Sequence, residues 1–202
     1  ERLDRKRTIT GAAQEKWLID GFNASTARWD VLGQQVFFAR RDVAAGPDEG
    51  YSMDAWDGYV ASQDKIASVM RDSRVRTGVV LTGDVHRHWA AEEKARYDGS
   101  DGDDVGVEFV TTSVTSGKDG DDGNQDRVIA ENPHLKYYRN RRGYVRTTFT
   151  AGQVRADYRI LPYVTKPGAR AITDASFVVN DGDPTLHRAG TSARLADQRV
   201  RR

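Results

Sequence analysis

The most informative hydrophobic pattern in the chain is a short apolar run followed at once by polar side chains. Residues 79–82 are Val-Val-Leu-Thr, a run rich in β-branched residues that predicts a buried strand. Gly83 then allows the backbone to turn sharply. Asp84 and His86 follow two positions apart, and in extended chain such a pair projects to the same side. We therefore expect one strand end to present a carboxylate and an imidazole together.

Helical periodicity predicts three further segments. A helix capped by Thr8 or Thr10 is expected to run to about Asn23, with Ala13, Trp17, Leu18 and Phe22 on its buried face. A second helix is expected over residues 59–73, where apolar residues recur at helical spacing. A short third helix is expected over residues 125–131, because Pro133 stops it.

Runs of apolar or alternating residues predict the strands. We expect strands over residues 28–40, 79–82, 90–97, 105–114, 145–150, 154–161 and 175–179. Glycine, proline and acidic residues predict a long loop over 42–57 and an acidic surface loop over 98–104. The chain is expected to divide into a folded part, residues 1–180, and a polar, basic tail, residues 181–202.

Composition narrows the possible partners and the class of protein. The chain has 202 residues, of which 38% are hydrophobic and 30% charged, as expected for a folded protein. Its 31 basic and 30 acidic residues leave a net charge of +1, so no nucleic-acid-binding signature is present. No apolar run predicts a transmembrane segment, and without cysteine no disulfide can form.

The N-terminal residues give two indications about the origin of the chain. Residues 1–7 are charged and lead into no apolar run, so no signal peptide is expected in this chain. The first residue is Glu1 and not methionine. We expect a fragment of a longer polypeptide whose N-terminal part is missing here.

The pair Asp84 and His86 is the main chemical candidate. α/β proteins place their chemistry past the ends of buried strands, and both side chains are ligands for borderline or hard metal ions. The spacing alone leaves a second interpretation open. In it, Asp84 caps a turn and His86 is a polar side chain with ordinary hydrogen bonds.

Three further residues are candidate substrate contacts. Asp57 belongs to a loop rich in aromatic and acidic residues, which suits a pocket rim, but an Asp cap for the following helix is the preferred interpretation. Thr115 lies in the hydroxyl-rich stretch 111–117, although threonine is also a common strand residue. His134 could reach the same site or be structural.

Several segments resemble one known family. The stretch LTGDVHRHWAAE is similar to the last metal-binding motif of the alkaline phosphatase D family, within the calcineurin-like metallophosphoesterases. The resemblance extends in order over about residues 8–180, through GAAQEKWL, ARWDVLGQQVFFA, MDAWDGY, VEFVTTSVTSG and NPHLKYYRNRRGYVR.

This resemblance implies a fold, an activity and a site. The fold would be an α/β sandwich of mixed β-sheets flanked by helices, as the C-terminal part of the family's domain. The activity would be hydrolysis of phosphate monoesters or diesters by a secreted, extracytoplasmic enzyme that uses iron and calcium. Asp84 and His86 would be metal ligands and hence catalytic. The family's earlier metal motifs have no counterpart here, so the chain would supply one wall of the site.

Two alternatives remain open from the sequence. The chain could be a non-catalytic binding domain that kept the scaffold and lost its metal centre. It could also belong to a different hydrolase, with a mononuclear zinc site formed by Asp84, His86 and His88.

Overall fold

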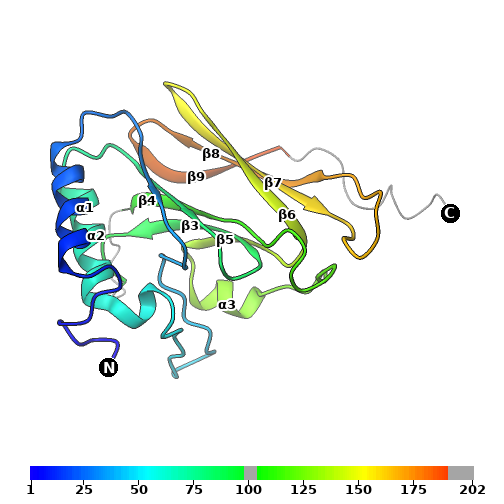
Figure 1. The fold of residues 1–202 in the computed structure, drawn as a ribbon, viewed down its shortest axis with the longest axis horizontal. Coiled ribbons are helices and arrows are strands. Elements are labelled where there is room, and N and C mark those ends of the chain that lie inside the picture. Colours follow the sequence, from blue (N-terminus) through cyan, green and yellow to red (C-terminus); the bar gives the residue numbers. More distant parts are fainter. Residues whose placement is uncertain (98–103, 191–202) are drawn as a thin grey trace.

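The computed structural model describes residues 1–97 and 104–190, in which two β-sheets stack face to face (Figure 1). The five-stranded sheet has the order β1 (Asp30–Gly33), β2 (Gly78–Thr82), β4 (Asp104–Val110), β3 (His88–Lys94) and β5 (Leu135–Arg139). The four-stranded sheet has the order β6 (Arg142–Phe149), β7 (Gln153–Leu161), β8 (Ile172–Asn180) and β9 (Asp183–Ala189).

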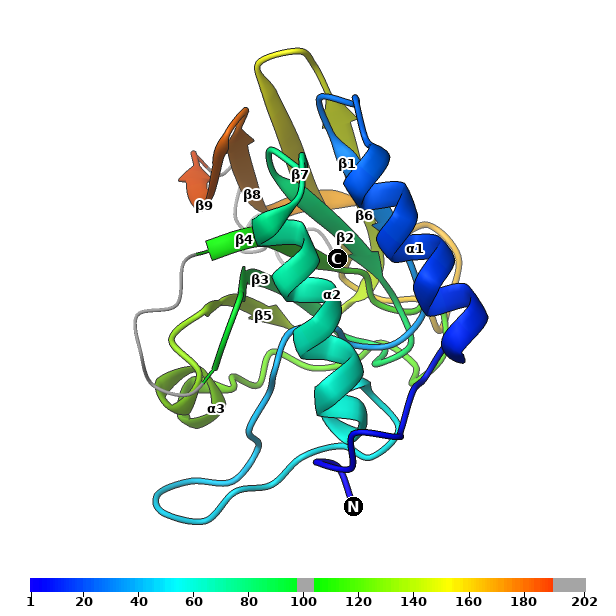
Figure 2. The same cartoon turned by 90° about the vertical axis from the view of Figure 1, so that its left-hand side faces the viewer.

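Two helices cover the outer face of the five-stranded sheet (Figure 2). They are α1 (Ala12–Ala24) and α2 (Val60–Asp72), and the 3-10 helix η1 (Trp56–Tyr59) leads into α2. The short helix α3 (Asp126–Glu131) packs through Val128 against another group of buried residues that includes Trp89. The predicted fold class, an α/β sandwich, is therefore confirmed. The prediction of mixed sheets holds for the five-stranded sheet only, because the four-stranded sheet is wholly antiparallel.

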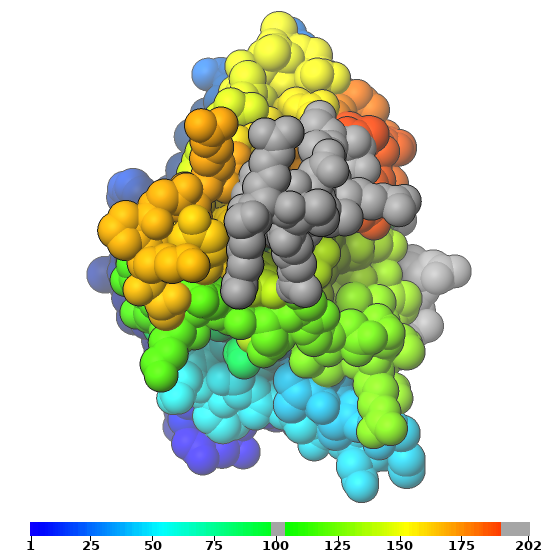
Figure 3. All heavy atoms as spheres, turned by 90° about the vertical axis from the view of Figure 1, so that its right-hand side faces the viewer, coloured from blue at the N-terminus to red at the C-terminus, as the bar shows by residue number. Residues whose placement is uncertain are grey.

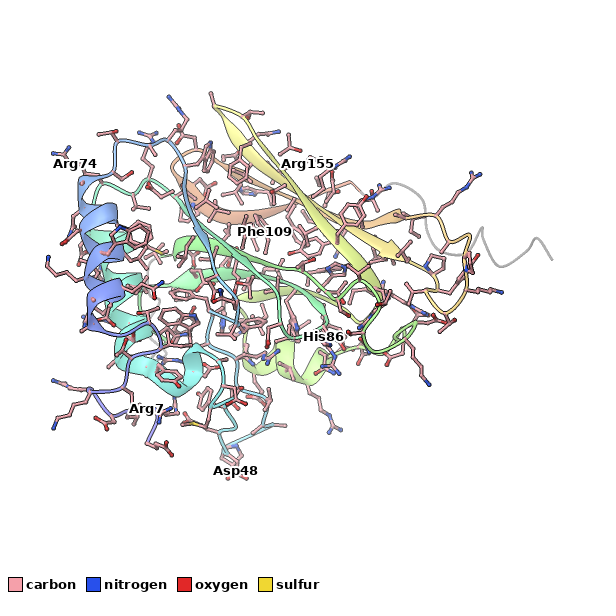
Figure 4. The ribbon with its side chains drawn as sticks, viewed as in Figure 1. Arg7, Asp48, Arg74, His86, Phe109 and Arg155 are labelled. Atoms are coloured by element: carbon pink, nitrogen blue, oxygen red, sulfur yellow. The ribbon has the colours of Figure 1, made fainter. Side chains whose placement is uncertain are left out.

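Strand β2 lies between two hydrophobic layers. Val79 packs toward the second sheet, together with Phe109 of β4 and Tyr158 of β7, whereas Val80 packs toward α2 and Phe22 of α1. Figure 4 shows Phe109 between the two sheets. A strand buried on both faces needs a continuous apolar run, which explains the Val-Val-Leu pattern.

Polar contacts also join the two sheets. The Tyr158 hydroxyl donates to the carbonyl of Trp89 at 2.5 Å. The Leu186 N–H of β9 donates to the Glu92 carboxylate of β3 at 3.1 Å. The expected tail boundary at residue 181 is therefore wrong, because residues 183–189 form a docked strand. Residues 191–202 of that tail lie outside the described part of the chain.

The expected strand over residues 28–40 is much shorter in the structure. Pairing with β2 ends at Gly33, yet Phe37, Phe38 and Ala39 are fully buried outside any strand. Their backbone groups bond to neighbouring segments instead. Phe38 N–H and Ala39 N–H donate to the Glu108 carboxylate at 2.9 and 3.0 Å, and the Phe38 carbonyl accepts from the Gln63 amide at 2.5 Å. Burial without ladder pairing is possible because these buried polar groups have partners.

Other differences concern single elements. Trp17, expected in the core, is 71% exposed, because α1 turns Phe22, Leu18 and Ile19 toward the sheet. Helix α1 has no side-chain cap, and Thr8 instead accepts from Gly11 N–H. Strand β5 was not predicted. Most of the acidic loop expected over 98–104 lies outside the described residues.

Within the described ranges, no helix is long and apolar enough to cross a membrane.

Candidate functional site

Several strand ends meet at one edge of the five-stranded sheet. Strands β1, β2 and β4 are parallel, so their carboxyl ends coincide, and antiparallel β3 starts at the same edge. Backbone hydrogen bonds continue past these ends, from Gly83 N–H to Gln35 O at 3.1 Å and from Thr111 N–H to Thr82 O at 2.8 Å. This is the edge at which open α/β sheets bind ligands.

The turn between β2 and β3 carries the predicted pair. Asp84 has φ 65° and His86 has φ 53°, so both occupy the left-handed region. The predicted extended geometry is therefore wrong, although the predicted position at the strand end is right. Aspartate and histidine enter this region more readily than most residues, and left-handed residues cluster at functional sites. Figure 4 shows His86 at the sheet end far from Arg74.

The side chains of Asp84 and His86 are available to a ligand. Both residues are exposed, and neither side chain makes a hydrogen bond or ion pair with another described residue. A carboxylate and an imidazole suit a borderline metal such as iron or zinc, and the carboxylate also suits calcium. Across residues 1–97 and 104–190, no group of three or more His, Asp or Glu side chains could hold a metal ion together.

His88 differs sharply from His86. It is fully buried, and its ring lies 5.3 Å from the Tyr158 ring, in the layer between the sheets. Burial lowers the pKa of His88 to about 4, so the neutral imidazole is favoured. The alternative zinc site that combines Asp84, His86 and His88 has no support in this arrangement.

A chain of buried hydrogen bonds fixes the strand residue that precedes the Asp84–His86 turn. The Trp56 indole donates to the side-chain Oε1 of Gln34 at 3.1 Å, and the side-chain Nε2 of Gln34 donates to the Thr82 hydroxyl at 2.5 Å. The Thr82 hydroxyl donates in turn to the Glu108 carboxylate at 2.5 Å. The residue next to Gly83 is thus fixed by groups from η1, from the segment after β1 and from β4.

Two of the candidate substrate contacts, Asp57 and His134, form hydrogen bonds with backbone groups instead. Asp57 is 1% exposed, and both its carboxylate oxygens accept from Arg41 N–H at 3.3 Å. It therefore does not cap α2, whose first turn has no side-chain cap. His134 is buried, and its Nε2 donates to the Arg40 carbonyl at 2.6 Å. Both side chains hold the segment that follows Ala39, and we do not retain them as substrate contacts.

The burial of Asp57 predicts a pH-dependent stability. Burial is the main cause that raises its pKa from 3.8 to about 7, while the Arg41 N–H bond and the charges of Arg40 and Arg41 oppose the rise. A raised folded-state pKa contributes stability below the unfolded value, and that contribution is lost as pH rises through about 7. Asp57→Asn removes this titration, so the stability of the variant relative to wild type should rise by about 3 kcal/mol between pH 4 and 7.

Denaturant unfolding across this pH range measures the difference. Asp54→Asn is the matched control, because Asp54 is exposed in the same loop. Parallel stability curves for wild type and Asp57→Asn would contradict the assignment.

The third candidate, Thr115, lies exposed in the loop that follows β4. That loop starts at the site edge, since the Thr111 methyl lies 3.9 Å from the Cβ position of Gly83. Figure 3 shows this end of the molecule, with the green loop above the cyan segment of residues 43–55. No described contact ties the Thr115 side chain to Asp84 or His86, so its role stays a prediction.

Sequence reasoning missed Arg142, which shapes this loop. Arg142 is 2% exposed, and its guanidinium donates to Ser113 Oγ at 2.8 Å, to the Ser116 carbonyl at 2.6 Å and to Asn140 Oδ1 at 2.5 Å. The run of two arginines before Gly143 was visible in the sequence. Nothing in that run indicated that both Arg141 and Arg142 would be buried.

Together these features define an α/β sandwich with an exposed Asp-x-His turn at the carboxyl ends of its parallel strands. The family model described as PhoD-like phosphatase matches residues 1–158. The chain belongs to the PhoD-like phosphatase family, which confirms the resemblance stated above.

Two similar proteins show what share of a PhoD-like protein this chain spans. The chain is 40% identical over 194 residues to alkaline phosphatase D of Bacillus subtilis strain 168, covering 95% of this chain and 33% of that protein. A solved structure titled "Structure of PhoD" matches with a TM-score of 0.91 and 40% identity, covering 96% of this chain and 38% of that one. The chain thus spans about a third of the length of the curated relative.

Proposed function

We propose that this chain forms the Asp84–His86 side of an active site that hydrolyses phosphate esters with the help of metal ions. The observation that carries the proposal is the turn itself. It holds two potential ligands in left-handed conformations at the ligand-binding edge of the sheet, exposed and without a described partner. Family membership supports the reaction class, because the matched family model is that of a phosphatase.

The donor set fits a metal in part. Asp84 would contribute a carboxylate oxygen and His86 an imidazole nitrogen, and further ligands would have to come from elsewhere in the polypeptide. A metal held there would stabilise charge on the phosphoryl oxygens and activate water for attack. Iron with calcium is the proposed pair, on the resemblance to the family, and zinc is the alternative.

The chain's own residues hold this turn in place. The Thr82 and Glu108 contacts fix the residue before Gly83, so the two ligands start from a rigid strand end. Preorganised ligands of this kind lose little freedom when they bind. We also propose an extracytoplasmic site of action, which the family resemblance alone supports.

Turnover tests the role of the pair. In the natural polypeptide that carries this chain, Asp84→Asn and His86→Asn should each reduce hydrolysis of a chromogenic phosphate monoester and diester by at least about a hundredfold. The estimate follows because loss of groups that merely orient a ligand already costs 10–100-fold. Asparagine is chosen since it tolerates the left-handed backbone.

The control for this assay is His187→Asn. His187 is an exposed histidine on β9, in the other sheet, and pairs with Asp183 at 2.9 Å. Full activity of both site variants would show that the turn takes no part in catalysis.

A further inference from the structure

A small cavity adjoins the Asp84–His86 turn and is lined by cationic and apolar groups. Its volume is about 210 Å³, well above the roughly 10–15 Å³ that one water requires. Its lining residues are Arg41, Val43, Arg87, Trp89, Gln125 and Val128. Arg87 directly follows His86 in the chain, so the cavity and the turn share a segment.

The two arginines in this cavity have no carboxylate partner of their own. Within residues 1–97 and 104–190, neither Arg41 nor Arg87 forms an ion pair. Burial lowers the pKa of Arg41, and the nearby positive charge of Arg87 adds to the effect, whereas the carboxylates of Asp57, Glu108 and Asp84 oppose it. Burial is the main cause that lowers the pKa of the Arg142 guanidinium, and the positive charge of nearby Arg87 adds to the effect. None of these carboxylates pairs directly with Arg41 or Arg87, so a further anion bound between the two guanidinium groups would reduce their repulsion.

Two buried donors on this lining also lack an acceptor. Arg41 Nε and Trp89 Nε1 have no hydrogen-bond partner in the described part of the chain, although Trp89 is only 2% exposed. The Arg41 guanidinium is held over the Phe37 and Trp89 rings, 4.5 and 5.5 Å from their centroids. A buried donor without an acceptor costs about 1–3 kcal/mol, so such groups call for a bound acceptor.

We propose that this cavity is a phosphoryl-oxyanion subsite, in which Arg41, Arg87 and the Trp89 indole bind the oxygens of the ester or of released phosphate. Arginine forks match tetrahedral oxyanions, and all three groups are donors without acceptor capacity. The choice of a phosphoryl ligand rests on the proposed function, whereas the preference for an oxyanion rests on the lining alone. The subsite would place the anion beside the residues proposed to hold metal.

The test is a titration of the natural polypeptide that carries this chain with inorganic phosphate, at constant ionic strength maintained with chloride and in the presence of a chelator. The readout is the NMR signal of the Trp89 indole N–H, assigned with Trp89→Phe. We expect a saturable shift of this signal and of the Arg41 Nε–H signal. A parallel titration with phenyl phosphate asks whether the esterified phosphoryl group binds at the same signals as free phosphate.

The variants separate specific binding from general attraction to a cationic surface. Arg87→Gln, at an exposed position, should weaken phosphate binding about tenfold, the effect of one charge-assisted hydrogen bond. Arg74→Gln should leave it unchanged, since Arg74 is exposed at the opposite end of the molecule (Figure 4).

Two results would overturn the subsite. One is the absence of a saturable shift at high millimolar phosphate, which would leave water as the occupant of the cavity. The other is equal weakening by Arg87→Gln and Arg74→Gln. Asp84→Asn and His86→Asn should still bind phosphate under the chelator, so the titration and the turnover assay can fail independently.

Discussion

Replacing Glu108 by alanine should destabilise the protein by about 4 kcal/mol, close to the whole stability of a marginal domain. The fully buried carboxylate accepts hydrogen bonds from the backbone N–H groups of Phe38 and Ala39 and from the Thr82 hydroxyl. Alanine would leave these donors buried without an acceptor and would open a cavity beside them. Because Thr82 precedes the Asp84–His86 turn, the loss should also loosen the site.

Glu93→Gln is the matched control. Glu93 is 1% exposed, and burial together with the nearby charge of Glu108 raises its pKa well above the ordinary value, which favours the protonated form. An amide resembles a protonated carboxyl in shape and polarity, so this variant should stay within about 1 kcal/mol of wild type. Denaturant midpoints compare the two. A loss below about 1 kcal/mol for Glu108→Ala would mean that residues 36–39 do not depend on this carboxylate.

Gly143→Ala should cost about 3 kcal/mol through steric conflict in the second sheet. Gly143 has φ 148°, and a Cβ there would lie 1.9 Å from the Arg159 carbonyl oxygen on β7. The same residue donates its N–H to the Ser113 carbonyl at 3.2 Å, which joins β6 to the loop beyond β4. A methyl group would therefore separate β6 from β7 and disturb that loop.

The comparison for this prediction is Gly152→Ala, in the turn between β6 and β7. A Cβ at Gly152 would meet nothing within 4 Å, so the change should be within about 0.5 kcal/mol of neutral. Thermal unfolding of the two variants gives the contrast. Equal melting temperatures would show that the close approach at Gly143 is relieved at little cost.

The sequence predicts those parts of the fold whose pattern is local. The apolar run at Val79 and Val80 marks a strand buried on both faces, and the alternation in residues 154–161 marks β7. Residues 36–39 were misassigned to a strand because a buried apolar segment looks the same whether or not it pairs with a neighbour. What distinguishes it is Glu108, about 70 positions away, whose role no local pattern reveals.

Some features of the site were likewise predictable from the sequence, and others were not. Its position after a glycine-terminated strand was predictable, whereas the left-handed backbone of Asp84 and His86 was not, because spacing does not set φ. Asp57 and His134 carry side chains suitable for contacting a substrate, but both are buried and form hydrogen bonds with backbone groups. Arg41, Arg87 and Arg142 come from different segments, and only the folded chain brings their charges together.

The metal content of the natural polypeptide tests the central proposal most directly. Wild type, Asp84→Asn, His86→Asn and the control His187→Asn would be purified identically, and iron, calcium and zinc would be quantified per chain by mass spectrometry. If Asp84 and His86 are ligands, each site variant should lose most of at least one metal that wild type and the control retain. Wild-type metal content in both site variants would contradict the account.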